Sequence, residues 1–251
     1  MNFLGIIPAR YGSTRLEGKP LVDIAGKPMI QWVYEETCKA LDTVYVATDD
    51  DRIADVVRSF GGNVVMTSAD HQNGTTRCLE AWNLINALET RTFDAALNIQ
   101  GDEPMLDAGS LEDLKNCFAG GETDFATLVI PVTTEEDLWN DSEVFVTFNK
   151  HMDALYFSRS VIPAIRGRHK MHWLEYGTFY KHLGLYAYTF KTLQAFANMA
   201  PSTLENYESL EQLRWIENGG SIKIGITEHE SIPVDTMDDL KRVREIMAKR
   251  A

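Results

Sequence analysis

The sequence has few cysteines, no long apolar run and no signal for export. Its three cysteines, Cys38, Cys78 and Cys117, are widely spaced, and no histidine stands near them at the spacing of metal ligands. This excludes a disulfide framework and a structural zinc site and predicts reduced thiols. The longest apolar runs, such as Phe3 to Ile7, are far shorter than the ~20 residues that span a bilayer. The first residues also lack the charged and apolar regions of a secretory signal, so we expect a cytoplasmic protein.

Positive charge is also in short supply. The chain of 251 residues has 24 Lys and Arg against 37 Asp and Glu, which gives a formal net charge of −13. Such a field repels polyanions, so nucleic-acid binding is not expected. What the chain does have is 44% hydrophobic and 24% charged residues. This composition is typical of a soluble globular protein and excludes disorder, collagen and fibrous repeats.

Strand and helix patterns alternate over the first half of the chain. The apolar run Phe3 to Ile7 indicates a buried strand that ends at Pro8. Further strands are expected at 43–47, 63–66 and 95–99, and helices at 28–39, 52–60, 76–88 and 111–118. This order predicts an α/β protein with a mainly parallel sheet.

The pattern changes after residue 118. Strand-like runs at 125–132, 144–148, 154–157 and 182–188 have few helices between them. They predict a mixed-sheet subdomain at about 125–190, embedded in a single domain that spans 1–251. Residues 166–178 have no period and predict a mobile surface loop that could close over a substrate. Helices at 190–199 and 204–218, a strand at 221–227 and a last helix from residue 238 complete the chain.

A cluster of cations follows the first strand. Arg10, Arg15 and Lys19 stand within ten residues and are interleaved with glycine and serine, whose backbone can approach a ligand closely. In an open α/β sheet, ligands bind at the carboxyl ends of strands, so this loop suits a polyphosphate. The loop matches neither a Walker A sequence nor GxGxxG, and a solvated basic loop is the alternative.

Two acidic segments are candidates for a metal site. Asp102 follows the strand predicted at 95–99, and a carboxylate there could hold Mg²⁺ together with phosphate oxygens. The alternative is an ordinary Gly-Asp turn. Asp235 could supply a second carboxylate, or Thr236 could simply cap the last helix, and the spacing does not separate these two interpretations.

Several polar residues in the second half could bind a polyhydroxylated acid. Arg159 suits a carboxylate, and His182 and Tyr186 share one face of a predicted strand. Glu211 and Gln212 lie in a predicted helix and could bind hydroxyl groups. Taken alone, each of these residues fits a structural role better than a binding role.

Together, seven motifs carry a family resemblance. They are Pro8–Pro20 (PARYGSTRLEGKP), Ala47–Asp50 (ATDD), Gln100–Pro104 (QGDEP), Ala154–Arg159 (ALYFSR), Lys181–Tyr186 (KHLGLY), Leu210–Arg214 (LEQLR) and Val234–Thr236 (VDT). In this order and over the whole chain they resemble the bacterial CMP-KDO synthetases, the 3-deoxy-manno-octulosonate cytidylyltransferases.

The resemblance implies a Rossmann-like nucleotidyltransferase fold with a mixed-sheet subdomain for sugar binding and dimerisation. It implies a homodimer that converts CTP and 3-deoxy-manno-octulosonate (KDO) to CMP-KDO and pyrophosphate with Mg²⁺, for lipopolysaccharide synthesis. A related acid, either 8-amino-KDO or a nine-carbon ulosonic acid, is the main alternative substrate. Two other classes stay open: a binding protein without turnover, and a nucleotidyltransferase for a neutral sugar phosphate.

The resemblance also implies roles for individual residues. The CTP site would comprise Ala9, Arg10, Ser13, Arg15, Lys19, Thr67, Gly74, Thr75 and Arg77. The sugar acid would contact Gln100, Arg159, His182, Tyr186, Glu211 and Gln212. Asp102 and Asp235 would hold the metal, and Arg15, Lys19 and Asp102 would be the catalytic residues. No general base is assigned, because none is obvious in the sequence and a metal that lowers the pKa of the attacking hydroxyl would make one less necessary.

Two departures from the family pattern bear on the choice of substrate. Thr76 stands where the family commonly has an acidic residue. Phe145 stands where the family strand commonly carries a lysine. The loss of that cation predicts a change in the sugar site.

Overall fold

The computed structural model describes residues 1–12, 15–140 and 142–249. The chain forms two compact units, one of residues 1–112, 188–197 and 229–251 and the other of residues 113–187 and 198–228. Within the described ranges, no helix is long and apolar enough to cross a membrane.

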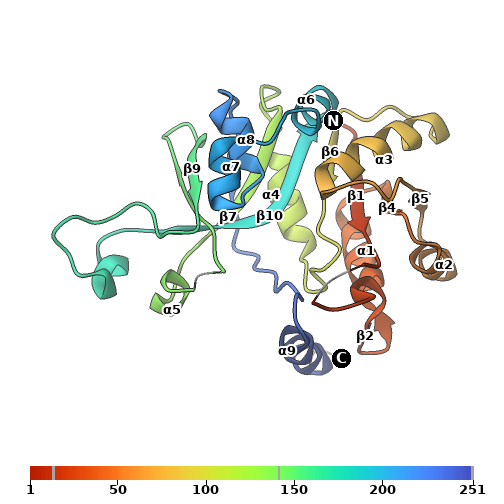
Figure 1. The fold of residues 1–251 in the computed structure, drawn as a ribbon, viewed down its shortest axis with the longest axis horizontal. Helices are drawn as coiled ribbons and strands as arrows, with labels where there is room; N and C mark the ends of the chain where they lie inside the picture. The colour runs from red at the N-terminus through yellow and green to blue at the C-terminus, as the bar shows by residue number, and fades with distance from the viewer. Residues whose placement is uncertain (13–14, 141, 250–251) are drawn as a thin grey trace. The chain divides into compact units, whose positions relative to one another are not determined.

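The first unit is built on parallel strands in the order β6-β1-β4-β5 (Figure 1). These are β1 (Phe3–Ala9), β4 (Val44–Thr48), β5 (Val64–Met66) and β6 (Ala95–Asn98). Leu4, Ile6 and Val46 are fully buried in this sheet. The prediction of an α/β fold with parallel strands is therefore confirmed, although β1 continues through Pro8 instead of ending there.

Helices follow the strands of the first unit at the predicted places. They are α1 (Met29–Ala40), α2 (Asp51–Ser59), α3 (Gly74–Leu88), α6 (Phe190–Ala197) and α9 (Met237–Ala248). The sequence did not predict the short helix η1 (Lys19–Leu21) or the hairpin of β2 (Asp23–Ile24) and β3 (Lys27–Pro28). Helix α4 (Ala108–Asn116) runs from the first unit into the second.

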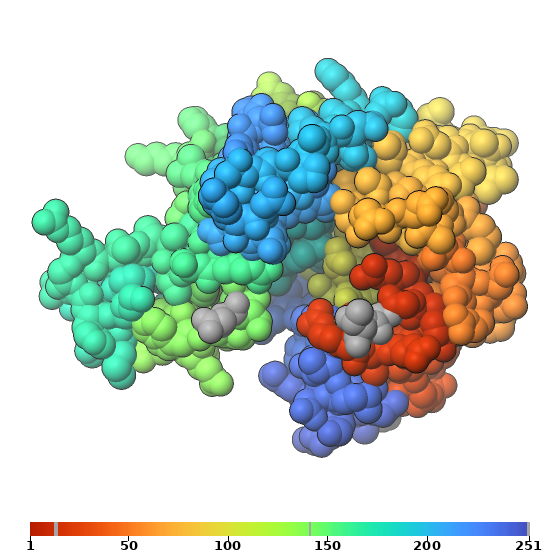
Figure 2. All heavy atoms as spheres, in the orientation of Figure 1, coloured from red at the N-terminus to blue at the C-terminus, as the bar shows by residue number. Residues whose placement is uncertain are grey.

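The C-terminal helix α9 packs on the hairpin and on the segment after β1. Leu240 and Val243 of α9 share an apolar cluster with Leu16 and Ile24, and Figure 2 shows this helix in blue beside the red N-terminal segment. The Arg244 guanidinium donates to the Asp23 carbonyl at 2.6 and 2.8 Å. This packing holds the residues just before α9 against the basic loop.

The second unit holds a mixed sheet. Strands β7 (Phe125–Pro131), β10 (Tyr180–Thr189) and β11 (Lys223–Ile226) lie in the order β11-β7-β10, with β11 parallel to β7. Strand β8 (Phe145–Phe148) pairs antiparallel with β10 and with β9 (Ala154–Ser158). The antiparallel strands expected in this part of the chain are thus present.

Short helices complete the second unit. They are α5 (Glu135–Leu138), η2 (Lys170–Glu175), α7 (Thr203–Glu208) and α8 (Gln212–Glu217). The single helix predicted at 204–218 is wrong, because the chain turns at Ser209, where φ is +53°. Helix η2 lies within the stretch predicted as a mobile loop, and its Trp173 stacks on Phe179 at 5.6 Å.

Candidate active site

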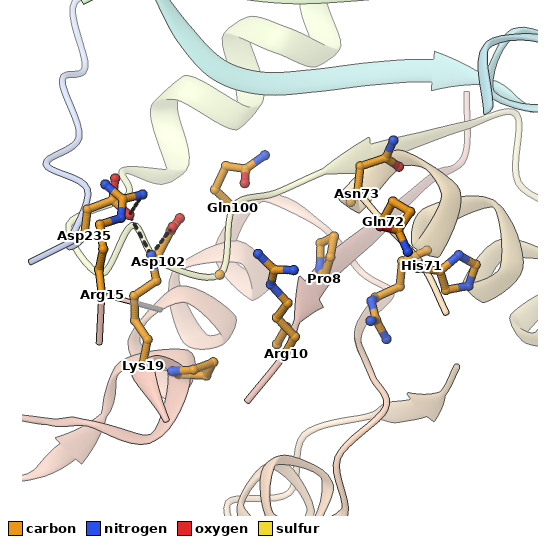
Figure 3. Close-up of a pocket in the computed structure, with 15 residues that line it drawn as sticks. Pro8, Arg10, Arg15, Lys19, His71, Gln72, Asn73, Gln100, Asp102 and Asp235 are labelled. Atoms are coloured by element: carbon orange, nitrogen blue, oxygen red, sulfur yellow. Dashed lines mark hydrogen bonds and ion pairs between the residues drawn. The ribbon is translucent and has the colours of Figure 1, made fainter. Parts of the chain in front are cut away.

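A cavity of about 310 Å³ lies in the first unit, beside the carboxyl ends of β1 and β6 (Figure 3). Acidic and basic side chains gather at one end of it, and Figure 3 shows the segment before α3 at the other. The residues that line it are Pro8, Ala9, Arg10, Arg15, Lys19, Pro20, His71, Gln72, Asn73, Gly74, Arg77, Gln100, Gly101, Asp102 and Asp235. A cavity of this size suits a small molecule.

The basic loop is folded back on itself at the edge of this cavity. Gly18 has a left-handed backbone with φ +64°, and its N–H donates to the Tyr11 carbonyl at 3.1 Å. The Tyr11 ring lies 3.0 Å from where a Cβ on Gly18 would stand, so a larger residue there would be strained in two ways. The turn aims Arg10, Arg15 and Lys19 at the cavity.

Lys19 connects two carboxylates from distant parts of the chain. Its Nζ donates to Asp102 Oδ2 at 2.5 Å and to Asp235 Oδ1 at 2.9 Å, and Arg15 Nη2 lies 3.3 Å from the same Asp235 oxygen. Burial alone would lower the pKa of Lys19, but the two carboxylates outweigh it and the pKa is raised above its ordinary value. Lys19 is therefore a permanent cation at neutral pH.

The two acidic segments are held together by backbone. The N–H of Val234 donates to the Asp102 carbonyl at 2.9 Å. Thr236 is the N-cap of α9 and forms a capping box with Asp239. The structure confirms that Thr236 caps the helix, and it places Asp235 against Lys19.

The far end of the cavity contains a fixed, buried arginine. Arg77 is only 4% exposed, and its Nη1 donates to Thr67 Oγ1 at 2.6 Å and lies 3.1 Å from Asp49 Oδ1. Thr67 follows β5 and Asp49 follows β4. Arg77 therefore joins two strand ends, and it also lines the cavity.

Most of the predicted CTP-site residues line the cavity. Ala9, Arg10, Arg15, Lys19, Gly74 and Arg77 do so, together with Gln100, Asp102 and Asp235. Thr67 and Thr75 do not line it: Thr67 lies behind Arg77, and Thr75 is buried in the first turn of α3. Ser13 lies outside the described residues.

The sequence interpretation missed the segment before α3. His71 and Gln72 line the cavity. The His71 ring pairs with Glu80 on α3, which also accepts the Ser68 N–H at 2.9 Å. The signal that could have found these residues is their place directly before Gly74, because a segment that enters a helix at a ligand site contributes its own side chains.

The remaining sugar-site candidates lie in the second unit. Thr127 Oγ1 donates its one proton to the Leu185 carbonyl at 2.7 Å, so it must accept from His182 Nε2 at 2.9 Å. His182 is thus the Nε2–H tautomer, which leaves Nδ1 as an acceptor. The ring centroids of His182 and Tyr186 are 5.4 Å apart. A hydroxyl group is a suitable partner for that Nδ1.

Glu211 and Gln212 are two further candidates in the second unit. Burial raises the pKa of Tyr186, and the charge of Glu211 raises it further, which shows that the two groups are close. Gln212 is 3% exposed, and its Nε2 has no hydrogen-bond partner among the described residues. A buried amide left in this way is suited to a polar ligand.

The environment of His182 predicts a pH effect. Loss of solvent lowers its pKa to about 3. Below the ordinary pKa near 6.5, only the unfolded chain then binds a proton at this ring, so stability falls as the pH falls. We expect wild type to lose more stability between pH 7 and pH 5 than His182→Gln does, measured by urea unfolding. Equal losses in the two proteins would show that His182 takes up a proton in the folded protein as readily as in the unfolded chain.

Phe145, where the sequence departs from the family pattern, lies on the opposite face of the sheet from His182. It stands directly opposite Lys181 in the β8–β10 pair. Opposite residues share a face of the sheet and successive residues alternate, so Phe145 faces away from His182. Its ring packs with Leu138 and Trp173.

Phe145→Leu is therefore expected to act on stability alone. Phe145 is 1% exposed, and the smaller side chain should lower the free energy of unfolding by about 1 kcal/mol. The KM for the sugar acid should stay within about twofold of wild type, since Phe145 and His182 lie on opposite faces of the sheet. Denaturant unfolding and steady-state kinetics measure the two quantities. A large rise in that KM would return Phe145 to the sugar site.

The other departure from the family pattern has a local explanation. Thr76 Oγ1 donates to Asn73 Oδ1 at 3.0 Å, and Asn73 caps α3 by accepting the Thr76 N–H at 2.9 Å. Thr76 therefore closes the helix start, and no carboxylate at this position is needed for the cap.

Fold and site together define an α/β protein with a charged cavity at the carboxyl ends of its parallel strands. The chain belongs to the cytidylyltransferase family, whose model matches residues 4–227. It is 50% identical to a 3-deoxy-manno-octulosonate cytidylyltransferase of Parabacteroides distasonis, with both chains covered in full. It is 46% identical to an 8-amino-3,8-dideoxy-manno-octulosonate cytidylyltransferase of Shewanella baltica, over 99% of each chain. A solved CMP:2-keto-3-deoxy-manno-octonic acid synthetase in complex with CTP superimposes with a TM-score of 0.90, at 39% identity over both full chains.

Proposed function

We propose that this protein transfers CMP from CTP to the anomeric hydroxyl of KDO and releases pyrophosphate. The observation that carries the proposal is the convergence of Arg10, Arg15 and Lys19 with Asp102 and Asp235 in one cavity. The full-length similarity to KDO cytidylyltransferases supports the choice of substrates.

In the reaction, the sugar hydroxyl oxygen attacks the α-phosphorus of CTP. A new O–P bond forms, the bond to the β-phosphate oxygen breaks, and the hydroxyl proton leaves to solvent. Arg10, Arg15 and Lys19 neutralise the triphosphate and the departing pyrophosphate, which is the main task of a protein in phosphoryl transfer. Lys19 can do this throughout the neutral range because its pKa is raised.

Asp102 and Asp235 fit a Mg²⁺ ion bound together with the nucleotide. In the described part of the chain no three His, Cys, Asp or Glu side chains form a metal-binding group, but Mg²⁺ with a triphosphate needs only one or two carboxylates. Both carboxylates lie within 3 Å of the same Lys19 nitrogen, which shows that they converge. The bound ion would supply charge neutralisation at the phosphates.

In this proposal the sugar acid contacts Gln100, Arg159, His182, Tyr186, Glu211 and Gln212. Arg159 takes the carboxylate, and the neutral His182 accepts from a hydroxyl. The proposal places the enzyme in the cytoplasm, as part of lipopolysaccharide synthesis. It includes a homodimer, which light scattering of the purified protein would test.

The first test is pyrophosphate release from CTP and Mg²⁺ with KDO, 8-amino-KDO and nine-carbon ulosonic acids side by side. We expect KDO to be used with a kcat/KM above ~10⁴ M⁻¹s⁻¹. Turnover of 8-amino-KDO alone would assign the protein to the activity of the Shewanella relatives. Absence of turnover with every acid would contradict the proposal.

Base recognition gives a second prediction. Arg77→Lys keeps the positive charge at this position. A lysine has no planar group of donors, so it cannot both bond to Thr67 and donate to a base as a guanidinium can. We expect the KM for CTP to rise about tenfold or more, with the KM for KDO little changed. Kinetics with each substrate varied in turn would measure this. A KM for CTP equal to that of wild type would exclude Arg77 from the base site.

A further inference from the structure

Arg159 is held in an unusual way for a residue that is exposed. Its Nε donates to the Glu208 carbonyl at 2.8 Å and its Nη2 to the Ser209 carbonyl at 3.4 Å. No carboxylate in the described ranges forms an ion pair with its guanidinium. Carbonyl groups orient a guanidinium without cancelling its charge, so Arg159 is fixed in direction and still able to pair with an anion.

The Glu208 side chain ties the same segment down at several points. Its Oε1 accepts from Ser158 Oγ at 2.9 Å and from Tyr156 Oη at 3.3 Å. Its Oε2 accepts the backbone N–H of Arg159 at 2.9 Å. One carboxylate thus fixes the end of β9 and the first residue after it, where the Arg159 side chain begins.

The backbone at Ser209 makes this arrangement possible. Ser209 ends α7 in the left-handed conformation, with φ +53° and ψ +47°, and its N–H donates to the Glu205 carbonyl. A residue other than glycine in this region is held there by its surroundings. The turn at this position presents two successive carbonyl groups, those of Glu208 and Ser209, to one guanidinium.

We propose that Glu208 is a positioning residue of the sugar-acid site and acts by holding Arg159 in the orientation that pairs with the substrate carboxylate. The proposal rests on the proposed function, in which Arg159 binds that carboxylate. Pairing of a guanidinium with a carboxylate depends on geometry, and a small displacement of a binding group is costly. Glu208 therefore sets affinity for the sugar acid and leaves CTP binding alone.

A neighbouring residue on the same helix provides the control. Glu205 also stands on α7, but it pairs with the buried Arg214, whose Nε donates to it at 2.7 Å. Loss of Glu205 should lower stability, because it leaves the buried charge of Arg214 without its partner. It should leave the orientation of Arg159, and therefore the KM values for KDO and CTP, unchanged.

The test is a double-mutant cycle of Glu208→Ala and Arg159→Ala, with Glu205→Ala as control. We expect Glu208→Ala to raise the KM for KDO about 10-fold or more and the KM for CTP by less than about twofold. In the Arg159→Ala background the same change should have no further effect on the KM for KDO. Melting temperatures are measured for every variant. If Glu208→Ala does not fold, Ser158→Ala, which removes one of the three donors, should shift the KM for KDO in the same direction by less.

The outcomes separate the two proposals. Additive effects of Glu208→Ala and Arg159→Ala, or an equal rise in both KM values, would make Glu208 structural and overturn the inference while the proposed function stands. Failure of wild type to release pyrophosphate with any sugar acid would overturn the proposed function and this inference with it. If Glu205→Ala raises the KM for KDO as much as Glu208→Ala does, the stability of α7 is the cause. That result would also overturn the inference about Glu208.

Discussion

Replacement of Asp102 by alanine is expected to lower pyrophosphate release by about 10³-fold or more while the fold persists. Asp102 contributes one of two carboxylates that converge on Lys19 and, in the proposed function, one ligand of Mg²⁺. Its loss removes that ligand and frees Lys19 from its shortest contact. The apolar core does not depend on it, because Asp102 lies at a turn after β6.

Asp238→Ala is the matched control for this change. Asp238 stands near Asp235 in sequence, but its side chain is 89% exposed and pairs with Lys241 on the same helix. An exposed pair of this kind contributes little, so both activity and stability should stay near wild type. Pyrophosphate release and circular dichroism would be measured for both variants. If Asp102→Ala keeps full activity, the pair of carboxylates takes no part in the mechanism.

The fold was predictable where the sequence repeats a simple pattern. The run Phe3 to Ile7 and the helix periodicity at 28–39 correspond to β1 and α1, because burial of one apolar set determines each of them. The helix predicted at 204–218 failed at Ser209, since a serine in the left-handed conformation leaves no mark in the sequence. Its surroundings impose that turn, and these come from parts of the chain far from it in sequence.

The candidate site divides in the same way. The basic loop could be predicted because its cations are close in sequence and follow a strand. The pairing of Asp102 with Asp235 could not be derived from spacing, because 132 residues separate them and contacts of the folded chain bring them together. Glu208 gave no signal at all: a lone glutamate in a helical stretch looks like a solvated face until its partners on β9 are seen.

Lys19→Met should abolish most activity and should also lower the stability of the ligand-free protein. It removes a fixed cation from the triphosphate site, which we expect to cost about 10²- to 10³-fold in kcat/KM. It also leaves Asp102 and Asp235 facing each other with Arg15 as the remaining cation at 3.3 Å from Asp235. Like charges at short range repel, so the ligand-free variant should melt below wild type.

The same change should make stability depend on Mg²⁺. With Lys19 absent, the two carboxylates have no competing ammonium between them, and a cation that binds only the folded state stabilises it. We expect millimolar MgCl₂ to raise the melting temperature of Lys19→Met more than that of wild type. Lys19→Arg, which keeps the charge, should respond as wild type does. If all three proteins respond identically, the two carboxylates do not form a cation site, because removal of the lysine ammonium did not strengthen Mg²⁺ binding.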